Sequence, residues 1–164
     1  MKKYEMTNES IEFRGVKLFR IRALQDFRGV NAGDLGGYIE KEENLSQYDY
    51  CWVYYNAKVF GDARIYGNAM VYGNARVYGN AEVYGNADAY KDTHVLQIGA
   101  IGSRDDTTTF FRTKDKKIYV ICGCFGGDIE KFEKAVEKEH KDTKHEKAYK
   151  LAIELAKLQI ELED

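Results

Sequence analysis

Several residue types and patterns are scarce or missing in this chain, and each absence excludes a class of protein. No apolar run approaches the roughly 18 residues of a membrane span, and residues 1–5 lack the apolar core of a secretion signal. We therefore expect a cytoplasmic protein that does not contact a membrane. Proline is absent, and the three cysteines, Cys51, Cys122 and Cys124, are an odd number. An odd count in an intracellular chain argues against a disulfide framework.

Charge of one sign and histidine are scarce as well. The formal net charge of −2 predicts neither a binder of duplex nucleic acid nor an acidic tail. Of the three histidines, only His94 is close to the repeat described below, so one subunit cannot assemble a three-histidine zinc site. His140 and His145 lie among lysines and are expected to be solvated. Because no phosphate-cradling Gly-Lys-Thr loop is present either, we expect no metal and no cofactor.

The middle of the chain contains a repeat of six residues. Its anchor is a hydrophobic residue at every sixth position, namely Val53, Val59, Ile65, Val71, Val77, Val83 and Ala89. A small residue stands two positions earlier in each unit, namely Cys51, Ala57, Ala63, Ala69, Ala75, Ala81 and Ala87. Gly-Asn or Gly-Asp joins most of the units. A fixed short period predicts a solenoid, in which each rung is stable only when it stacks on its neighbours.

The content of the repeat predicts how each unit folds. Every Ala-x-Val-Tyr stretch is expected to be a short strand, with Ala and Val pointing inward and the other two side chains outward. Gly and Asn tolerate positive φ, so they are expected at the corners. Three units then complete one coil of a short left-handed parallel β-helix in a mainly β protein. Separate hairpins with Asn corners are the alternative, but hairpins do not require one strict period.

Three sides per coil place residues eighteen positions apart on one outer face, about 4.8 Å from each other. The first face carries Trp52, Tyr54, Met70, Tyr72, Asp88 and Tyr90. The second face carries Lys58, Phe60, Arg76, Tyr78, His94 and Leu96. The third face carries Arg64, Tyr66, Glu82 and Tyr84.

The first face is a nearly uncharged aromatic strip, which is not expected to face water. It either meets the same strip of other subunits in a homo-oligomer or is covered by the C-terminal helix of its own chain. The oligomer is the favoured interpretation, and a trimer is expected by analogy with other left-handed β-helices. The expected interface residues on this face are Trp52, Tyr54, Met70, Tyr72 and Tyr90.

The second face is basic and aromatic. Lys58, Arg76 and Tyr78 either decorate the wall through cation–π contacts or bind a ligand. His94 has a position that an acyltransferase base could occupy. No unit carries an inserted loop for an acyl-CoA cleft, so His94 is expected to be a decoration of the wall.

The segment before the repeat is expected to cap it. Residues Ser10–Phe13 and Val16–Leu24 are predicted to form a hairpin around a turn at Arg14 and Gly15. The glycine-rich stretch 29–37 is predicted to be a loop. Ile39 and Leu45 lie six residues apart and indicate an irregular first coil that closes the open end, since an uncapped rung exposes unpaired edges. We therefore divide the chain into a cap at 1–50, a β-helix at 51–102 and a C-terminal module at 103–164.

The C-terminal module is predicted to combine a hairpin and two helices. Its strands are expected at Thr107–Thr113 and Ile118–Cys122. Asp128 is suited to cap a helix that ends near His140, and Thr143 with Glu146 forms a capping box for a last helix that ends near Glu161. This last helix carries a heptad seam that is expected to help hold subunits together. The seam residues proposed for the oligomer interface are Leu151, Leu155, Leu158 and Leu162.

Polar residues cluster at the start of this module. Alternation places Thr108 and Arg112 on one strand face with Arg104 nearby, and guanidinium and hydroxyl groups hold phosphate or carboxylate oxygens well. The favoured interpretation, however, is an Arg–Asp network that ties the hairpin to the last coil, and the anion site is the alternative. Cys122 and Cys124 share a strand face and are expected to be small buried hydrophobic residues.

The repeat and its flanking motifs resemble a family of phage and prophage proteins, usually described only as left-handed β-helix or polymer-forming proteins. The resemblance rests on the motifs at 33–40, 44–46, 51–54, 102–113 and 122–127, together with the Tyr-Gly-Asn-Ala units. It implies a β-helical oligomer of phage origin, located in the cytoplasm of the infected bacterium, and it implies no catalytic residue.

Three functions remain open from the sequence. The favoured one is a non-enzymatic oligomeric binding protein that counters a host defence, either by sequestering a phosphorylated signal nucleotide or by inhibiting a host protein. Its candidate ligand-binding residues are Arg104, Thr108, Arg112, Lys58, Arg76 and Tyr78. The second function is a purely structural assembly module. The third is an acyltransferase-like enzyme built on the hexapeptide repeat.

Overall fold

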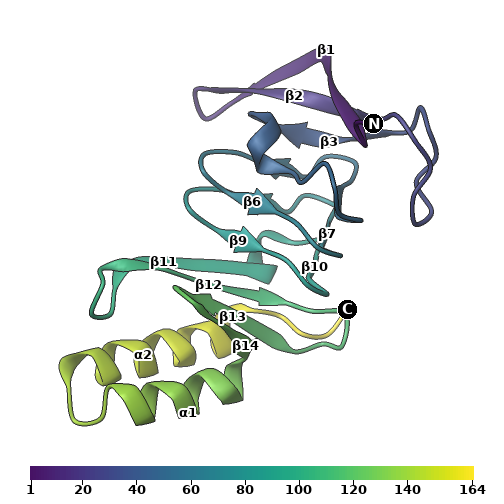
Figure 1. Ribbon diagram of the computed structural model, residues 1–164. Helices are drawn as coiled ribbons and strands as arrows, with labels where there is room; N and C mark the ends of the chain where they lie inside the picture. Colours follow the sequence, from purple (N-terminus) through teal and green to yellow (C-terminus); the bar gives the residue numbers. More distant parts are fainter. The chain divides into compact units, whose positions relative to one another are not determined.

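The computed structural model describes residues 1–164 and divides them into two compact units, Met1–Asp92 and Thr93–Asp164 (Figure 1). The three-part division expected from the sequence therefore differs from the observed one. The repeat and its cap form a single unit, and the C-terminal unit begins at Thr93 instead of at residue 103. Neither of the two helices is long and apolar enough to cross a bilayer.

The N-terminal unit begins with a hairpin and a short third strand. Strands β1 (Tyr4–Phe13) and β2 (Val16–Ala23) pair antiparallel, as predicted, and β3 (Leu35–Ile39) adds to β2. Part of the expected loop is thus a strand. Its glycines have a steric role, because a Cβ on Gly36 would lie 2.6 Å from the carbonyl oxygen of Val53 and a Cβ on Gly37 would lie 2.6 Å from that of Ala57.

The repeat forms a series of two-residue strands joined by tight corners (Figure 1). These strands are β4 (Trp52–Val53), β5 (Lys58–Val59), β6 (Arg64–Ile65), β7 (Met70–Val71), β8 (Arg76–Val77), β9 (Glu82–Val83) and β10 (Asp88–Ala89). The corner glycines have φ between 64° and 68°, a region that other L-residues adopt at a cost. All the anchor residues and the small residues two positions earlier are buried, so the predicted inner side of the repeat is confirmed.

Strand pairing confirms the assignment of the three outer faces. Trp52 pairs in parallel with Met70, and Met70 pairs with Asp88, so the first face is one stack of strands. Lys58 pairs with Arg76 on the second face. Arg64 pairs with Glu82 on the third.

An irregular first coil connects the cap to the repeat. Ile39 of β3 pairs with Val59, and Leu45 forms a parallel bridge with Ile65, so both residues occupy inner positions as predicted. Between them lies a short 3-10 helix, η1 (Glu42–Asn44). The fully buried side chain of Asn44 donates to the carbonyl oxygens of Gly61 and Ala63 at 3.0 and 2.8 Å, which links the cap to the first regular coil.

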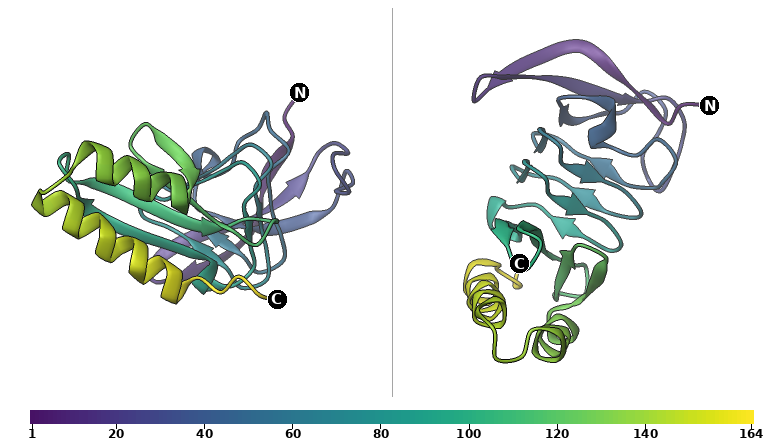
Figure 2. Two further views of the ribbon diagram at one scale, coloured as in Figure 1. Left: turned by 90° about the horizontal axis from the view of Figure 1, so that it is seen from below. Right: turned by 60° about the vertical axis from the view of Figure 1, so that its left-hand side comes forward.

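The C-terminal unit is a four-stranded antiparallel sheet with both helices packed against it (Figure 2). After the 3-10 helix η2 (Asp92–His94), its elements are β11 (Val95–Ile101), β12 (Asp106–Arg112), β13 (Ile118–Cys122), β14 (Phe125–Asp128), α1 (Ile129–Glu139) and α2 (Lys144–Gln159). The predicted strands and helices of this unit are present. The strand β14 and the role of β11 were not anticipated.

The repeat ends earlier than predicted. Leu96 pairs antiparallel with Phe110 of β12, so it does not extend the second face. His94 closes η2 and is fully buried, which contradicts its expected place as an outward decoration.

The helix caps follow the sequence closely. The carboxylate of Asp128 accepts a hydrogen bond from the backbone N–H of Lys131 at 2.9 Å and begins α1. The hydroxyl of Thr143 accepts one from the N–H of Glu146 and begins α2. The Glu146 carboxylate accepts from the N–H of Asp142, one residue before the position that a standard capping box uses.

Candidate functional site

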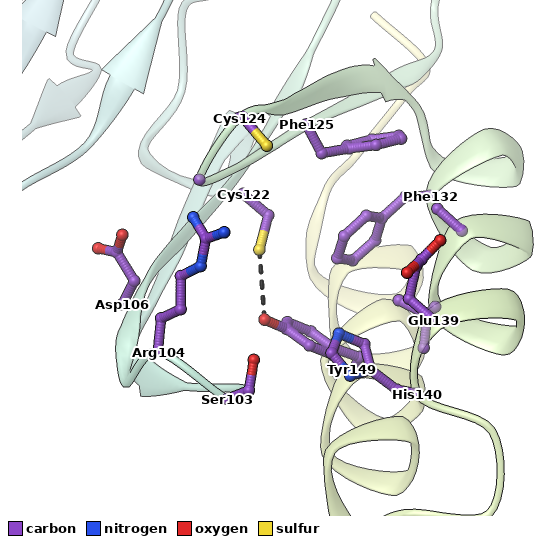
Figure 3. Close-up of a pocket in the computed structure, with 13 residues that line it drawn as sticks. Ser103, Arg104, Asp106, Cys122, Cys124, Phe125, Phe132, Glu139, His140 and Tyr149 are labelled. Carbon is purple, nitrogen blue, oxygen red and sulfur yellow. Dashed lines mark hydrogen bonds between the residues drawn. The ribbon is translucent and has the colours of Figure 1, made fainter.

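A cavity of about 520 Å³ lies within the C-terminal unit, between the sheet and the two helices (Figure 3). Its volume is within the range of small-molecule sites, which are also concave, mostly apolar and provided with a few polar groups. The lining residues come from the turns β11–β12 and β13–β14, from the start of β12, the end of β13 and the start of β14, and from both helices with the residue after α1. They are Ser103, Arg104, Asp106, Cys122, Gly123, Cys124, Phe125, Phe132, Ala135, Val136, Glu139, His140 and Tyr149.

Aromatic rings form the apolar part of this cavity. Phe132 of α1 packs against Phe125 of β14 with ring centroids 5.1 Å apart and edge-on against Tyr149 of α2 at 5.4 Å. The Tyr149 ring also lies 5.4 Å from the imidazole of His140. These rings offer faces and edges against which a planar ligand can stack.

The Tyr149 hydroxyl is the best-positioned polar group of the cavity. It lies 3.4 Å from the sulfur of Cys122, and either of these two groups can donate to the other. The hydroxyl of Thr108 donates to the same sulfur at 3.2 Å. Gly102 makes room for the Tyr149 hydroxyl, since a Cβ there would lie 1.9 Å from its oxygen. Burial, followed by the hydrogen bond to Cys122, raises the pKa of Tyr149 above its ordinary value of about 10. The phenol is therefore neutral and able to donate at physiological pH.

Charged groups of both signs stand around the cavity. Arg104 comes from the β11–β12 turn, Asp106 is the first residue of β12, and Glu139 is the last residue of α1 (Figure 3). Arg104 is the only Lys or Arg in the lining, which also contains two acidic residues, Asp106 and Glu139. This balance favours a ligand with a single negative charge over one with several phosphates, whose repulsion from the two acids would grow with each added charge.

The structure does not bring the three residues of the predicted anion site together. Arg104 lines the cavity and is exposed. Thr108, in contrast, is fully buried, and its hydroxyl donates a hydrogen bond to the sulfur of Cys122. Arg112 is 2% exposed, donates to the carbonyl oxygen of Leu162 at 3.2 Å and pairs with Asp164. The expectation fails because the helices and the C-terminal tail cover the strand face that Thr108 and Arg112 share.

The predicted basic second face is occupied by the N-terminal hairpin. Phe13, at the end of β1, lies under the Lys58 ammonium at 5.3 Å and under the Arg76 guanidinium at 5.9 Å. Arg76 also forms an ion pair with Asp92. Tyr78 stacks on Phe60 with centroids 5.3 Å apart. These contacts within the chain favour the interpretation that Lys58, Arg76 and Tyr78 decorate the wall over the interpretation that they bind a ligand.

The first face is partly covered by its own chain, at its N-terminal end. Trp52 is only 1% exposed and packs edge-on against Tyr4 at 6.1 Å and Phe27 at 5.4 Å. The expectation that Trp52 meets another subunit is therefore wrong, and neither of the two burials that the sequence suggested applies to it. The cap of the repeat covers Trp52. The sequence pattern showed that the cap precedes the repeat, but it did not show which outer face the cap would cover.

The remainder of the first face forms a ladder of rings. Tyr72 stacks on Tyr90 at 5.3 Å, meets Tyr54 edge-on at 6.2 Å and donates to the carboxylate of Asp88 at 2.7 Å. Tyr54, Tyr72 and Tyr90, like Met70, are half-buried, and their contact with another subunit stays a prediction.

Sequence reasoning missed most of the cavity. It did not anticipate the site role of Tyr149, Phe125 or Phe132, and it assigned His140 to solvent although His140 lines the cavity. Cys124 was expected to be buried but is exposed, because β13 ends at Cys122 and the alternation of faces stops there. The sequence feature that could have indicated the cavity is Cys122-Gly123-Cys124-Phe125. There a glycine turn between two strands brings two cysteines and a phenylalanine close together.

Comparisons with known proteins concern the repeat. Residues 63–79 match the family model described as YdcK Beta solenoid repeat, which agrees with the parallel stacks above. The protein named Uncharacterized acetyltransferase YdcK, from Escherichia coli (strain K12), is 39% identical over 70 residues. This match covers 37% of the present chain and 22% of the relative, so the two proteins share only a part of their lengths. The family match does not reach the cavity.

Proposed function

We propose that this protein is a non-enzymatic binding protein that takes a small aromatic ligand into the cavity of its C-terminal unit. The observation that carries the proposal is the combination of a cavity of about 520 Å³ with one arginine and a neutral, buried phenol in its wall. In this proposal the repeat is a left-handed β-helix that serves as a scaffold, as the resemblance to phage proteins implies.

The lining suggests the chemistry of the ligand. A planar ring system would lie against Phe125, Phe132 and Tyr149, and the Tyr149 hydroxyl would donate to a ring nitrogen or carbonyl oxygen. Arg104 would pair with one anionic group, in the bidentate manner that guanidinium allows for carboxylate and phosphate oxygens. Nucleotides with a single phosphate charge and aromatic monocarboxylates both meet this description.

The resemblance to phage proteins gives the proposal a biological form. Binding of a cyclic mononucleotide would sequester a host immune signal and so counter the defence that depends on it. This form is narrower than the one suggested by the sequence, because a site with one arginine and two carboxylates disfavours signals with several phosphates.

Calorimetry with a ligand panel tests the proposal. The panel contains cyclic mononucleotides, cyclic dinucleotides, aromatic monocarboxylates and the matching neutral aromatic amides. We expect heat from at least one singly charged aromatic ligand. Arg104→Gln should weaken its binding about 10- to 100-fold, the usual range for one charged hydrogen bond, and Ala135→Trp should abolish it by filling the cavity. Arg64→Gln is the matched control, since Arg64 is exposed on the third face, and it should bind as the wild type does.

Two results would overturn this proposal. One is the absence of heat from every ligand of the panel at millimolar concentration. The other is binding that neither Arg104→Gln nor Ala135→Trp changes, because such binding would occur elsewhere on the protein.

Acetyl transfer is a second candidate, favoured by the printed name of the relative that shares the repeat. The burial of His94 opposes it, since a general base must reach the proton that it removes. Release of free thiol from acetyl-CoA, followed with a thiol reagent in the presence of small amines, tests this candidate directly. Turnover that survives Arg104→Gln and Ala135→Trp would favour an enzyme on the repeat over a binding protein.

A further inference from the structure

Two cysteines lie at the tight turn between β13 and β14. Cys122 at the end of β13 pairs with Phe125 at the start of β14, so the turn has only two residues, a glycine and the second cysteine. Gly123 has a φ of 56°, and a chain bent there keeps the Cα atoms of Cys122 and Cys124 closer than the roughly 7 Å beyond which a disulfide requires backbone movement. Both cysteines line the same cavity (Figure 3). The turn therefore holds two sulfur atoms within reach of each other.

The surroundings of this turn are those of reactive thiols. Cys124 is exposed and Cys122 is half-buried, so a small oxidant can reach the pair from solvent. The Arg104 guanidinium lies close to the turn, since its Nη1 would be 3.6 Å from a Cβ placed on Gly123. Exposure and a neighbouring positive charge distinguish reactive cysteines from structural ones. The third cysteine, Cys51, is fully buried in the N-terminal unit and lacks this exposure.

We propose that Cys122 and Cys124 form a reversible disulfide when the protein meets a peroxide. The sulfur of Cys124 attacks one oxygen of hydrogen peroxide, the O–O bond breaks, and the products are a sulfenic acid and water. The sulfur of Cys122 then attacks the sulfenic sulfur. An S–S bond forms, the S–O bond breaks, and the leaving hydroxide takes the thiol proton as a second water. Two thiols are thus oxidised, and one peroxide is reduced to two waters.

The contacts of Cys122 indicate what this bond would change. In the reduced protein its sulfur is hydrogen-bonded to the hydroxyls of Thr108 and Tyr149, at 3.2 and 3.4 Å. A bond to Cys124 draws the sulfur away from both hydroxyls and leaves the fully buried Thr108 without this partner. Oxidation should therefore weaken the contact between α2 and the sheet, whether or not the cavity holds the proposed ligand.

The size of the new ring makes the bond reversible. It closes over only three residues, so it is strained, and strained or exposed disulfides are the ones that are easily reduced again and serve as regulatory sites.

Peptide mass spectrometry after treatment with hydrogen peroxide tests the proposal. Trypsin releases residues 118–131 as one peptide, which contains both cysteines of the turn but not Cys51. When free thiols are alkylated in denaturant before digestion, we expect this peptide to be unalkylated and about 2 Da lighter than its reduced form. Dithiothreitol should restore both alkylation sites. Cys122→Ser should instead accumulate a sulfenic acid at Cys124, which dimedone labels.

The rate of disulfide formation tests the role of the neighbouring charge. Arg104→Gln should slow the reaction at least about threefold, because the positive charge favours the attacking sulfur. Arg64→Gln is the matched control, since Arg64 is an exposed residue of the N-terminal unit, and it should react at the rate of the wild type.

Urea unfolding followed by far-UV circular dichroism measures the effect on the C-terminal unit, because both helices belong to it. Peroxide should lower the urea midpoint of the wild type by about 0.5–1 M and leave that of Cys124→Ser unchanged. The proposal is overturned if the peptide keeps both alkylation sites after peroxide, or if the disulfide joins two chains. An unchanged midpoint of the oxidised wild type also overturns it, as does an unchanged rate in Arg104→Gln.

Discussion

The hydroxyl of Tyr149 on α2 lies 3.4 Å from the sulfur of Cys122 at the end of β13. The hydroxyl of Thr108 on β12 donates to the same sulfur at 3.2 Å. Three elements of the C-terminal unit therefore meet at one sulfur atom, on the wall of the candidate ligand cavity. The contact places the Tyr149 phenol at the wall of the cavity, and it also ties α2 to the sheet.

The first prediction concerns the pH dependence of this contact. Folding raises the pKa of Tyr149, so the proton on its phenol stabilises the folded state. This contribution is complete below the ordinary tyrosine pKa of about 10 and is lost as the pH rises through the higher native value. We expect the free energy of unfolding to fall less steeply above pH 10 in Tyr149→Phe than in the wild type. Urea titrations at pH 8, 10 and 11, followed by circular dichroism, measure the difference.

The comparison of wild type with Tyr149→Phe is necessary because other tyrosines of this chain also titrate at high pH. Burial also raises the pKa of Tyr4 and of Tyr66, so the wild type loses stability in strong base for several reasons. Only the difference between wild type and Tyr149→Phe reports on the cavity. Identical slopes for the two proteins would show that the Tyr149 phenol titrates normally.

The second prediction uses two glycines of the repeat that differ in one respect. Gly73 and Gly85 have φ of 65° and 64°, so an alanine at either position suffers the same backbone strain, about 1–2 kcal/mol. A Cβ on Gly73 would also lie 2.5 Å from the carbonyl oxygen of Tyr90, whereas a Cβ on Gly85 would meet nothing within 4 Å. We expect Gly73→Ala to lower the stability of the unit clearly more than Gly85→Ala.

The fluorescence of the single tryptophan measures the stability of the N-terminal unit in these two variants. Trp52 lies in the N-terminal unit, so its change on urea unfolding reports on the repeat and its cap. Equal midpoints for the two alanine variants would mean that neighbouring coils approach each other less closely at Gly73 than the structure shows.

The regular part of the fold was accessible from the sequence because one period determines it. Each unit repeats an inner Ala and an inner Val, and the side chains between them must alternate, so the partners of Trp52, Lys58 and Arg64 follow from counting eighteen residues. Helix caps were equally accessible, since Asp128 and Thr143 act on donors only a few residues away. These features depend on local geometry and need no knowledge of distant segments.

The features that sequence reasoning missed depend on distant contacts. The cover over Trp52 comes from Tyr4 and Phe27, and no local pattern specifies which face the cap protects. The β-helix was predicted to continue to residue 102 because Val95 and Ile101 keep the six-residue spacing of the inner positions. That spacing also fits a straight strand, because six is a multiple of the two-residue alternation. The cavity combines side chains from two turns, three strands and two helices, whereas the predicted cluster of Arg104, Thr108 and Arg112 was based on one strand and the turn before it.

The third prediction tests the cover over Trp52. Removal of this fully buried ring leaves a cavity against the cap, and such truncations cost about 3–5 kcal/mol. We therefore expect Trp52→Ala to destabilise the N-terminal unit by that order, as measured by urea unfolding with circular dichroism. If Trp52 were instead an interface residue, the variant would change the mass in sedimentation with little effect on the stability of the monomer.

The last prediction concerns Asn44, which binds the cap to the first coil from a fully buried position. Its side-chain oxygen accepts from the N–H groups of Glu40 and Lys41 at 3.2 and 3.0 Å, and its amide donates to two carbonyl oxygens of the coil. Asn44→Ala leaves four backbone groups without this partner and should cost about 3 kcal/mol.

Asn44→Asp separates the two halves of this network. It keeps the accepting oxygen but sets a carboxylate against the carbonyl oxygens of Gly61 and Ala63, so at pH 7 we expect a loss at least as large as in Asn44→Ala. Burial and these oxygens favour the protonated carboxyl, which can donate one bond. The stability of Asn44→Asp relative to wild type should therefore recover as the pH falls from 7 to 5. Tryptophan fluorescence during urea unfolding at both pH values measures this, and a deficit independent of pH would show that the side-chain amide does not face the coil carbonyls.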